Sequence, residues 1–118
     1  MKDENIIKTK SLDFAIRIVK LYRHVIESDN EYALSKQILK SGTSIGANVR
    51  EAIGAQSKDD FIAKMHIALK EVYETEYWLE LLYKTDYLTQ NEFESIFTDC
   101  RELTNIIARI VKTTKERK

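Results

Sequence analysis

The residues best suited to chemistry are two histidines, one cysteine and a group of glutamates. A di-iron bundle site needs a glutamate three residues before a histidine, but Leu21 precedes His24 and Ala63 precedes His66 at that spacing. The sequence also has no His-Glu-x-x-His motif and no cysteine pair that would form another metal cage. We therefore expect no metal centre and no cofactor, and we place both histidines on polar helix faces.

The cysteine and the glutamates do not predict an active site either. Cys100 is in register with Ile96 and Leu103, where a free cysteine packs as a small apolar side chain. The glutamates could bind a cation or act as an acid–base pair, but helical spacing divides them between two faces. We interpret most of them as a solvated negative face and Glu76 as a candidate for burial, so the sequence predicts a protein that is not an enzyme. The four glutamates are Glu71, Glu74, Glu76 and Glu80.

Four helical segments must position these residues. The chain has no proline, and its apolar residues recur at alternating spacings of three and four, which is typical of one face of a helix. The stripes that we expect in the core are Leu12, Ala15, Val19, Tyr22 and Ile26 in residues 9–27; Leu34, Ile38, Ile45, Val49 and Ala52 in residues 32–55; Phe61, Met65, Ala68, Val72, Leu79 and Tyr83; and Phe93, Ile96, Cys100, Leu103, Ile107 and Ile110.

The breaks between these segments are short and polar, reading ESDNE, QSKDD and KTDYLT. Short connections favour antiparallel neighbours. Ser57 with Asp60, and Thr89 with Glu92, have the spacing of a capping box at the start of a helix. The sequence therefore predicts an all-α fold, an antiparallel up-down-up-down four-helix bundle that occupies residues 1–118 as one domain.

Composition limits the classes of function. The 19 basic and 19 acidic residues balance, so no overall positive charge indicates binding to nucleic acid or to anionic membranes. The single cysteine cannot form an internal disulfide, and the amino-terminal residues MKDENIIKTK carry too much charge for a secretory signal. No apolar run approaches the roughly 20 residues of a transmembrane helix. We expect a cytoplasmic protein.

The stretch SGTSIGANVREAIGA, residues 41–55, contains all three glycines of the chain. It does not fit a phosphate-binding loop, because Gly46 is followed by Ala47 and Asn48 rather than by lysine and a hydroxyl residue. Gly42 and Gly46 lie four residues apart on one shoulder of a helix, where small residues allow another helix to pack closely. A kink or break in the helix at these glycines is the alternative.

Asn48 and Glu76 interrupt apolar surfaces and are candidates for a buried polar pair. A buried amide needs hydrogen-bond partners, and Thr75 and Glu76 could supply them from the third helix. The pair could belong to an active site or to a polar network that fixes helix register. We favour the structural network, because no nucleophile and base accompany the pair.

Second apolar stripes on two helices predict self-association. The first helix carries one beside its expected core face, and the third carries one opposite its core face, whereas a monomer would leave both exposed. Tryptophan is a frequent anchor of protein interfaces. The residues that we predict at an interface between copies are Phe14, Ile18, Leu21 and Val25 on the first helix and Ile67, Trp78 and Leu81 on the third.

Basic residues form two partial stripes, which offer a surface for the phosphates of RNA or DNA. In a symmetric assembly such stripes would repeat in every subunit and would bind phosphates with a strong salt dependence. No aromatic residue interleaves the stripe of the fourth helix, which favours contact with the nucleic-acid backbone over base stacking. A solvated polar surface balanced by neighbouring acids is the alternative. The nucleic-acid-binding candidates are Arg17 and Lys20 on the first helix and Arg101, Arg109 and Lys112 on the fourth.

The runs LSKQILKSGTSIGANVREA and SKDDFIAKMHIALKEVYETEYWLELL resemble the bacterial four-helix bundle family that includes the 23S ribosomal RNA intervening-sequence proteins. The resemblance covers nearly the whole chain, although many relatives have glycine where this chain has Ala52. It implies a cytoplasmic bundle that assembles as a ring-like homopentamer without an established enzymatic activity. Some members are encoded inside ribosomal RNA insertions, and a related branch assists the reverse transcriptase of diversity-generating retroelements, with suggested roles in nucleic-acid and protein binding.

The sequence therefore supports two candidate functions. The first is a non-enzymatic homo-oligomer, expected to be a pentamer, that binds RNA, DNA or a nucleic-acid enzyme through basic helix faces. The alternative is a protein-interaction scaffold with no affinity for nucleic acid.

Overall fold

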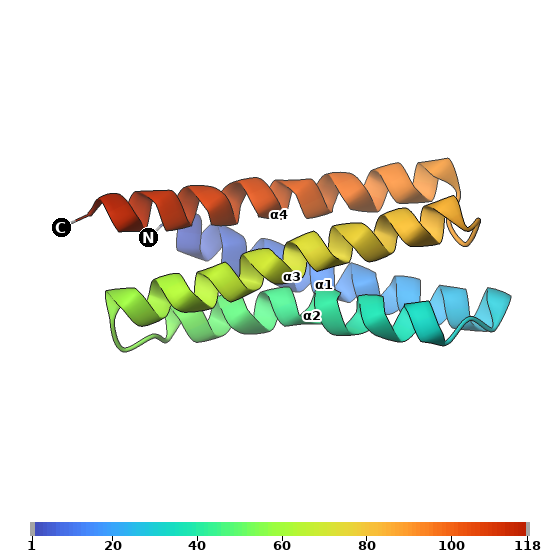
Figure 1. Ribbon diagram of the computed structural model, residues 1–118, viewed down its shortest axis with the longest axis horizontal. Coiled ribbons are helices and arrows are strands. Elements are labelled where there is room, and N and C mark those ends of the chain that lie inside the picture. The colour runs from blue at the N-terminus through green and yellow to red at the C-terminus, as the bar shows by residue number, and fades with distance from the viewer. Residues whose placement is uncertain (1, 118) are drawn as a thin grey trace.

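The computed structural model describes residues 2–117, which form a bundle of four antiparallel helices (Figure 1). The bundle is about 50 Å long and 21 by 19 Å across. The amino-terminal helix starts and the carboxy-terminal helix ends at the same end of the bundle, as up-down-up-down topology requires (Figure 1). The helices are α1 (Lys2–Asp29), α2 (Ala33–Ile53), α3 (Lys58–Lys84) and α4 (Gln90–Glu116).

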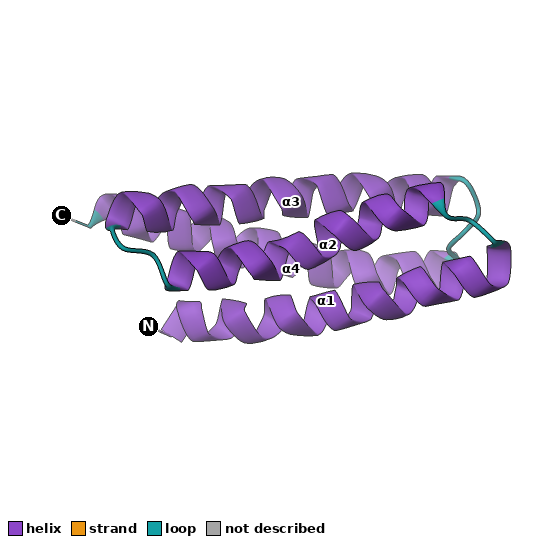
Figure 2. Ribbon diagram, turned by 90° about the horizontal axis from the view of Figure 1, so that it is seen from below, coloured by secondary structure: helices purple, strands orange, loops and turns teal. Residues whose placement is uncertain are grey.

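Each helix packs against its two neighbours around a square, and the α1–α4 pair closes that square less tightly than the other pairs. Figure 2 shows α1 and α3 on opposite sides of the bundle, with α2 and α4 between them. Residues on the outer faces of α1 and α3 therefore point away from each other. This arrangement confirms the predicted all-α fold with four helices.

Side-chain caps set the starts of three helices. At α4 the Thr89 hydroxyl accepts a hydrogen bond from the Glu92 amide (3.1 Å), and the Glu92 carboxylate accepts one from the Thr89 amide (2.8 Å), so the predicted capping box is present. At α3 the Ser57 hydroxyl accepts from the Asp60 amide. The start of α2 uses a residue that the sequence analysis missed, since the Glu31 carboxylate accepts from the amides of Leu34 and Ser35.

The core lies along the bundle axis and is filled by aliphatic side chains from all four helices. The stripes predicted for α2, α3 and α4 supply most of it, and Ile38, Ile45, Met65, Leu79 and Ile107 are fully buried. Within residues 2–117, every buried side-chain nitrogen and oxygen atom has a hydrogen-bond partner. The predicted periodicity of these three helices is thus confirmed.

The prediction for α1 was wrong, because its two apolar stripes exchange places. Phe14 and Ile18, which we expected between copies of the chain, are buried in the core together with Val25, whereas Leu12 and Ile16 are about half exposed. The inner stripe begins earlier than expected, at the fully buried Ile7 and Ser11. Its large members Phe14, Ile18 and Val25 have no polar group, whereas the outer stripe includes the phenol of Tyr22, whose hydroxyl would need a hydrogen-bond partner in the core. Leu21 is partly buried against the core.

The glycines of α2 lie where α1 approaches, and α2 continues through them without a break. A Cβ atom added at Gly42 would lie 2.8 Å from two side-chain carbons of Ile18, which is closer than real Cβ contacts. A Cβ atom at Gly46 would lie 3.4 Å from the backbone oxygen of Ser11. Gly42 therefore allows the α1–α2 contact, and Gly46 does so with more room.

Candidate interaction surfaces

The side chains that could take part in chemistry do not lie together. Cys100 is fully buried, and its thiol lies 3.8 Å from the Val72 carbonyl oxygen. Burial raises the pKa of the Cys100 thiol, and the charge of Glu76 raises it further, so the reactive thiolate is disfavoured. His24 lies at the surface with its Nε2 atom 3.8 Å from the Glu92 carboxylate, and His66 is exposed on α3.

Metal ligands do not gather within residues 2–117, where no group of three or more histidine, cysteine, aspartate or glutamate residues is placed to hold an ion. The glutamates of α3 point in different directions, as their spacing indicated. Glu76 is partly buried, with 13% of its side chain exposed, and it accepts hydrogen bonds from Arg101 and Thr104 of α4. Across residues 2–117, no helix is apolar over enough of its length to span a bilayer.

The polar network between helices has different members from those predicted. The Thr75 hydroxyl donates to the Ser41 hydroxyl across the α2–α3 contact (2.9 Å), and both residues are buried. Asn48 is only partly buried, and its amide donates to the Ser44 carbonyl one turn earlier in the same helix. Asn48 and Glu76 therefore act separately, because Glu76 turns toward α4.

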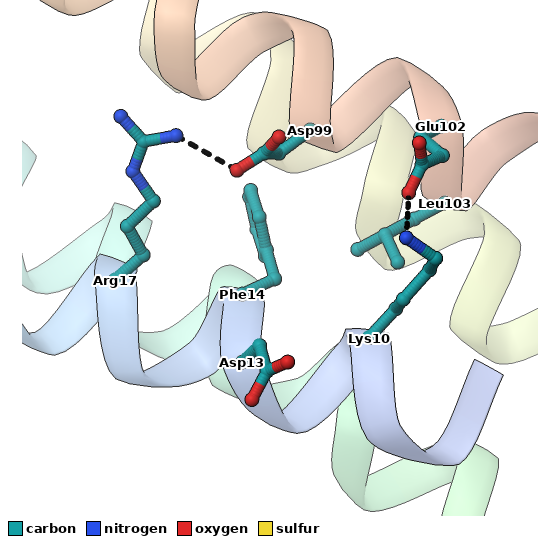
Figure 3. Close-up of a pocket in the computed structure, with 7 residues that line it drawn as sticks. All are labelled: Lys10, Asp13, Phe14, Arg17, Asp99, Glu102 and Leu103. Carbon is teal, nitrogen blue, oxygen red and sulfur yellow. Dashed lines mark hydrogen bonds and ion pairs between the residues drawn. The ribbon is translucent and has the colours of Figure 1, made fainter. Parts of the chain in front are cut away.

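A pocket of about 260 Å³ lies on the α1–α4 seam and combines charged walls with an apolar floor. Figure 3 shows Arg17 reaching Asp99 of α4, Lys10 reaching Glu102, and Phe14 between the two pairs. Arg17 also donates to the Ser95 carbonyl and hydroxyl groups. Both cations of the pocket are thus neutralised by carboxylates of the same chain, which lowers the attraction for an outside anion.

The same pairing extends along the whole seam. Asp3 pairs with Arg109 at one end, and His24 faces Glu92 at the other. The four α1 members, Asp3, Lys10, Arg17 and His24, follow one another at intervals of seven residues, which returns each to the same helix face after two turns. Three ion pairs, made by Asp3, Lys10 and Arg17, therefore join α1 to α4, the neighbouring helices that pack least closely.

The predicted nucleic-acid residues therefore divide into two groups. Arg17, Arg101 and Arg109 each pair with a carboxylate of a neighbouring helix. Lys20 and Lys112 are exposed and make no ion pair within residues 2–117. The structure does not bring the five residues together as one open cationic surface.

An aliphatic surface, here called the α1 surface, consists of Leu12, Ala15, Ile16 and Val19. Leu12 and Ile16 are 48% and 47% exposed. Beside it lies a depression of about 220 Å³ over the small residues Gly46 and Ala47 of α2. Lys20 and Arg23 border one part of the α1 surface, and Arg50 borders the depression. We predicted Leu12, Ala15 and Val19 in the core, but Leu12 is exposed and Ala15 and Val19 are only partly buried.

An aromatic surface, here called the α3 surface, consists of Ile67, Tyr73, Tyr77 and Trp78. Tyr73 and Tyr77 are 51% and 58% exposed, and Ile67 is 40% exposed. The rings of Tyr77 and Trp78 meet edge to face at 5.0 Å, and the Trp78 indole donates to Glu74. Leu81 is also partly exposed on this helix. We predicted Ile67, Trp78 and Leu81 at an interface, and all three are at least partly exposed. Tyr73 and Tyr77 were not predicted, although their spacing of four residues places them on one face.

These features define a class of protein, a four-helix bundle whose polar seam is closed by its own ion pairs and whose apolar side chains reach solvent on α1 and α3. The profile of the 23S rRNA-intervening sequence protein family matches residues 3–109. The chain belongs to that family.

Known structures agree with this assignment. The crystal structure of a protein of unknown function from the S23 ribosomal protein family of Bacteroides thetaiotaomicron is 55% identical to this chain. The alignment covers 93% of this chain and 98% of that one, with a TM-score of 0.92. No curated protein matches the sequence.

Proposed function

We propose that the protein is a non-enzymatic, self-assembling helical scaffold. The observation that carries this proposal is the presence of two separate apolar surfaces, on the diagonally opposite helices α1 and α3. Each contains side chains that are about half exposed, and exposed aromatic and aliphatic clusters of this kind are typical of protein interfaces. The resemblance stated above leads us to expect five subunits.

Light scattering coupled to size exclusion tests the proposal, because it measures the mass of the particle independently of its shape. We expect a mass several times the 13.8 kDa of one chain. A particle that remains monomeric at concentrations up to hundreds of micromolar would overturn the proposal. Leu12→Asp, which places a charge within the α1 surface, should lower that mass, whereas Ala108→Asp is its matched control, because it places the same charge at an exposed apolar residue of α4.

Nucleic-acid binding is a second candidate function, favoured by the charge around the α1 surface. Lys20, Arg23 and Arg50 make no ion pair within residues 2–117, and an assembly would repeat them in every subunit. We propose this region, rather than the paired arginines of the α1–α4 seam, as the surface for phosphates. This proposal retains Lys20 from the five residues predicted from the sequence, and it replaces Arg17, Arg101, Arg109 and Lys112 with Arg23 and Arg50.

Electrophoretic retardation of RNA at several salt concentrations tests this second candidate. Arg23→Glu should weaken retardation about tenfold more than Arg109→Glu, since the loss of an unpaired cation reduces the counterions released on binding. Absence of retardation at low salt would leave the scaffold as the only proposed function.

A further inference from the structure

We infer that the α1–α4 seam opens before the bundle unfolds, and that the exposed ion pairs across it control the opening. The protein thereby contains a conformational switch that responds to ionic strength. Opening takes place within one chain, so this switch goes beyond the proposed function and does not depend on self-assembly. Such a switch needs a joint that is weaker than the others, contacts that salt can weaken, and core residues that opening exposes.

The α1–α4 seam is the weakest of the four joints between neighbouring helices. These are the first and last helices, so no turn connects them, whereas residues 30–32, 54–57 and 85–89 connect the other three pairs. They also pack less closely than any other neighbouring pair. Two pockets, of about 260 and 290 Å³, follow one another along the seam and share Arg17 in their lining. Regions of low contact density are the ones that open locally in a folded protein.

Buried contacts hold the other three joints. Between α1 and α2, Ile18 packs closely against Gly42. Between α2 and α3, the Thr75 hydroxyl donates to the Ser41 hydroxyl, and both residues are buried. Between α3 and α4, the buried thiol of Cys100 contacts the α3 backbone. Because salt screens exposed charges far more than buried groups, it should leave these three joints closed.

The contacts that salt can weaken are the three ion pairs of the seam. Their six side chains are between 31% and 55% exposed. Arg17 makes the most contacts among them, since its guanidinium also donates to the carbonyl and hydroxyl oxygens of Ser95. Salt at about 1 M shortens the range of electrostatic attraction to about 3 Å, so it weakens all three pairs together. The pairs are Lys10–Glu102, Arg17–Asp99 and Asp3–Arg109.

The core residues that opening would expose lie at the floor of the seam. Figure 3 shows Phe14 between the ion pairs of Lys10 and Arg17, with Leu103 of α4 in the same pocket. Phe14 is 3% exposed and Leu103 is 1% exposed. Separation of α1 from α4 would bring both side chains into contact with water. A thiol at the position of Leu103 would therefore report the opening.

The reaction of buried thiols with an uncharged reagent tests the switch, because a buried thiol reacts only when the structure opens around it. Leu103→Cys places a thiol at the seam, and Leu79→Cys makes the same change at a fully buried residue of α3. Both substitutions are made together with Cys100→Ala, which removes the native thiol. Circular dichroism verifies that each variant folds, and denaturant unfolding gives the rate of reaction that global unfolding alone would allow.

We expect the Leu103→Cys thiol to react at least about tenfold faster than global unfolding allows, and the Leu79→Cys thiol to react at the rate of global unfolding. An increase in NaCl from about 50 mM to about 1 M should raise the first rate on the order of tenfold and change the second by less than about twofold. Light scattering at each salt concentration verifies that the comparisons are made at one particle mass.

Removal of one cation from the seam should act as salt does. Arg17→Met, added to the Leu103→Cys variant, removes the contacts with Asp99 and Ser95 and should raise the rate of reaction at low salt by about fivefold or more. Arg101→Met is the matched control, because it removes an exposed arginine that pairs with Glu76 across the α3–α4 joint. It should leave the rate at the seam within about twofold.

Reaction of both thiols at the rate of global unfolding, at every salt concentration, would overturn the switch. So would a fast reaction of the Leu103→Cys thiol that neither salt nor Arg17→Met changes, because the ion pairs would then not control the opening. If Leu103→Cys does not fold, hydrogen exchange of the unsubstituted protein decides. Salt should then lower the protection of α1 amides and leave that of α3 amides unchanged, because a helix owes most of its stability to packing. Equal loss of protection in both helices would overturn the switch, and a monomeric protein that opens at the seam would refute only the proposed function.

Discussion

Gly42 is the residue at which one added carbon atom should matter most. Its absent side chain faces Ile18 at a distance of 2.8 Å, inside the α1–α2 contact. We expect Gly42→Ala to lower the free energy of unfolding by about 1–3 kcal/mol, because overpacking outweighs the gain in helix propensity. Denaturant unfolding monitored by circular dichroism measures the change.

Gly46→Ala is the matched control, since its added carbon would lie 3.4 Å from the nearest atom. It makes the same chemical change in the same helix, but in a more open place. We expect it to be neutral or to stabilise by up to about 1 kcal/mol. Equal destabilisation by the two substitutions would show that close approach at Gly42 does not determine the cost.

Cys100 should be chemically silent in the folded protein. Its thiol is fully buried, and burial raises its pKa, so the protonated form persists at pH values where a free thiol near pKa 9.0 begins to ionise. We expect a thiol reagent at pH 8 to label the native protein at least about 100-fold more slowly than the unfolded protein. The rate should rise with the fraction unfolded in denaturant. Rapid labelling without unfolding would mean that the α3–α4 contact opens locally.

At the scale of the element, the ion pairs of the α1–α4 seam predict a dependence of stability on pH. The hydrogen bond from Arg109 lowers the pKa of Asp3 below 3.8, and the Glu102 carboxylate raises the pKa of Lys10 above 10.5. Asp3 stabilises the folded protein at pH values above the pKa that it has in the unfolded chain. This stabilisation is lost as the pH falls through the pKa that Asp3 has in the folded protein. Lys10 stabilises the folded protein at pH values below the pKa that it has in the unfolded chain. This stabilisation is lost as the pH rises through the pKa that Lys10 has in the folded protein.

The ion pairs of the seam should therefore stabilise the fold most between about pH 4 and pH 10. We expect the thermal midpoint of Asp3→Asn to lie slightly below that of the wild type at pH 7, with the difference vanishing near pH 2. Because both pairs are exposed, high salt should reduce the same difference. A difference that is unchanged across this pH range would mean that the charge of Asp3 is not its cause, and would assign it to the different hydrogen bonding of the amide.

The elements also show what the sequence could predict and why the rest required a structure. On α2 and α4 the face opposite the apolar stripe is polar, so periodicity alone identifies the core. On α1 two neighbouring stripes are apolar, and only the packing of Ile18 against Gly42 shows which one faces inward. Ion pairs such as Arg17–Asp99 join residues 82 positions apart, so their detection needs the register between two helices. The Glu31 cap was missed because its carboxylate acts from outside the usual capping-box position.

At the scale of the whole molecule, the separation of charge between the two helical hairpins makes assembly sensitive to salt. Helices α1 and α2 together carry nine basic and six acidic residues, a net charge of +3, and helices α3 and α4 carry eight and eleven, a net charge of −3. Copies that bring these unlike sides together would therefore attract each other. Salt shortens the range of this attraction to about 10 Å at 0.1 M and about 3 Å at 1 M. Apolar contacts respond in the opposite direction or not at all.

We therefore expect the dissociation constant between copies to rise on the order of tenfold when NaCl increases from about 50 to about 500 mM. Analytical ultracentrifugation over a concentration series measures it, and circular dichroism at the same salt concentrations verifies that the bundle remains folded. Arg23→Glu should reduce both the affinity at low salt and the dependence on salt, because it removes a cation beside the α1 surface. Association that strengthens with salt would mean that exposed apolar side chains such as Leu12, Ile16 and Tyr77 hold copies together without help from the charges around them.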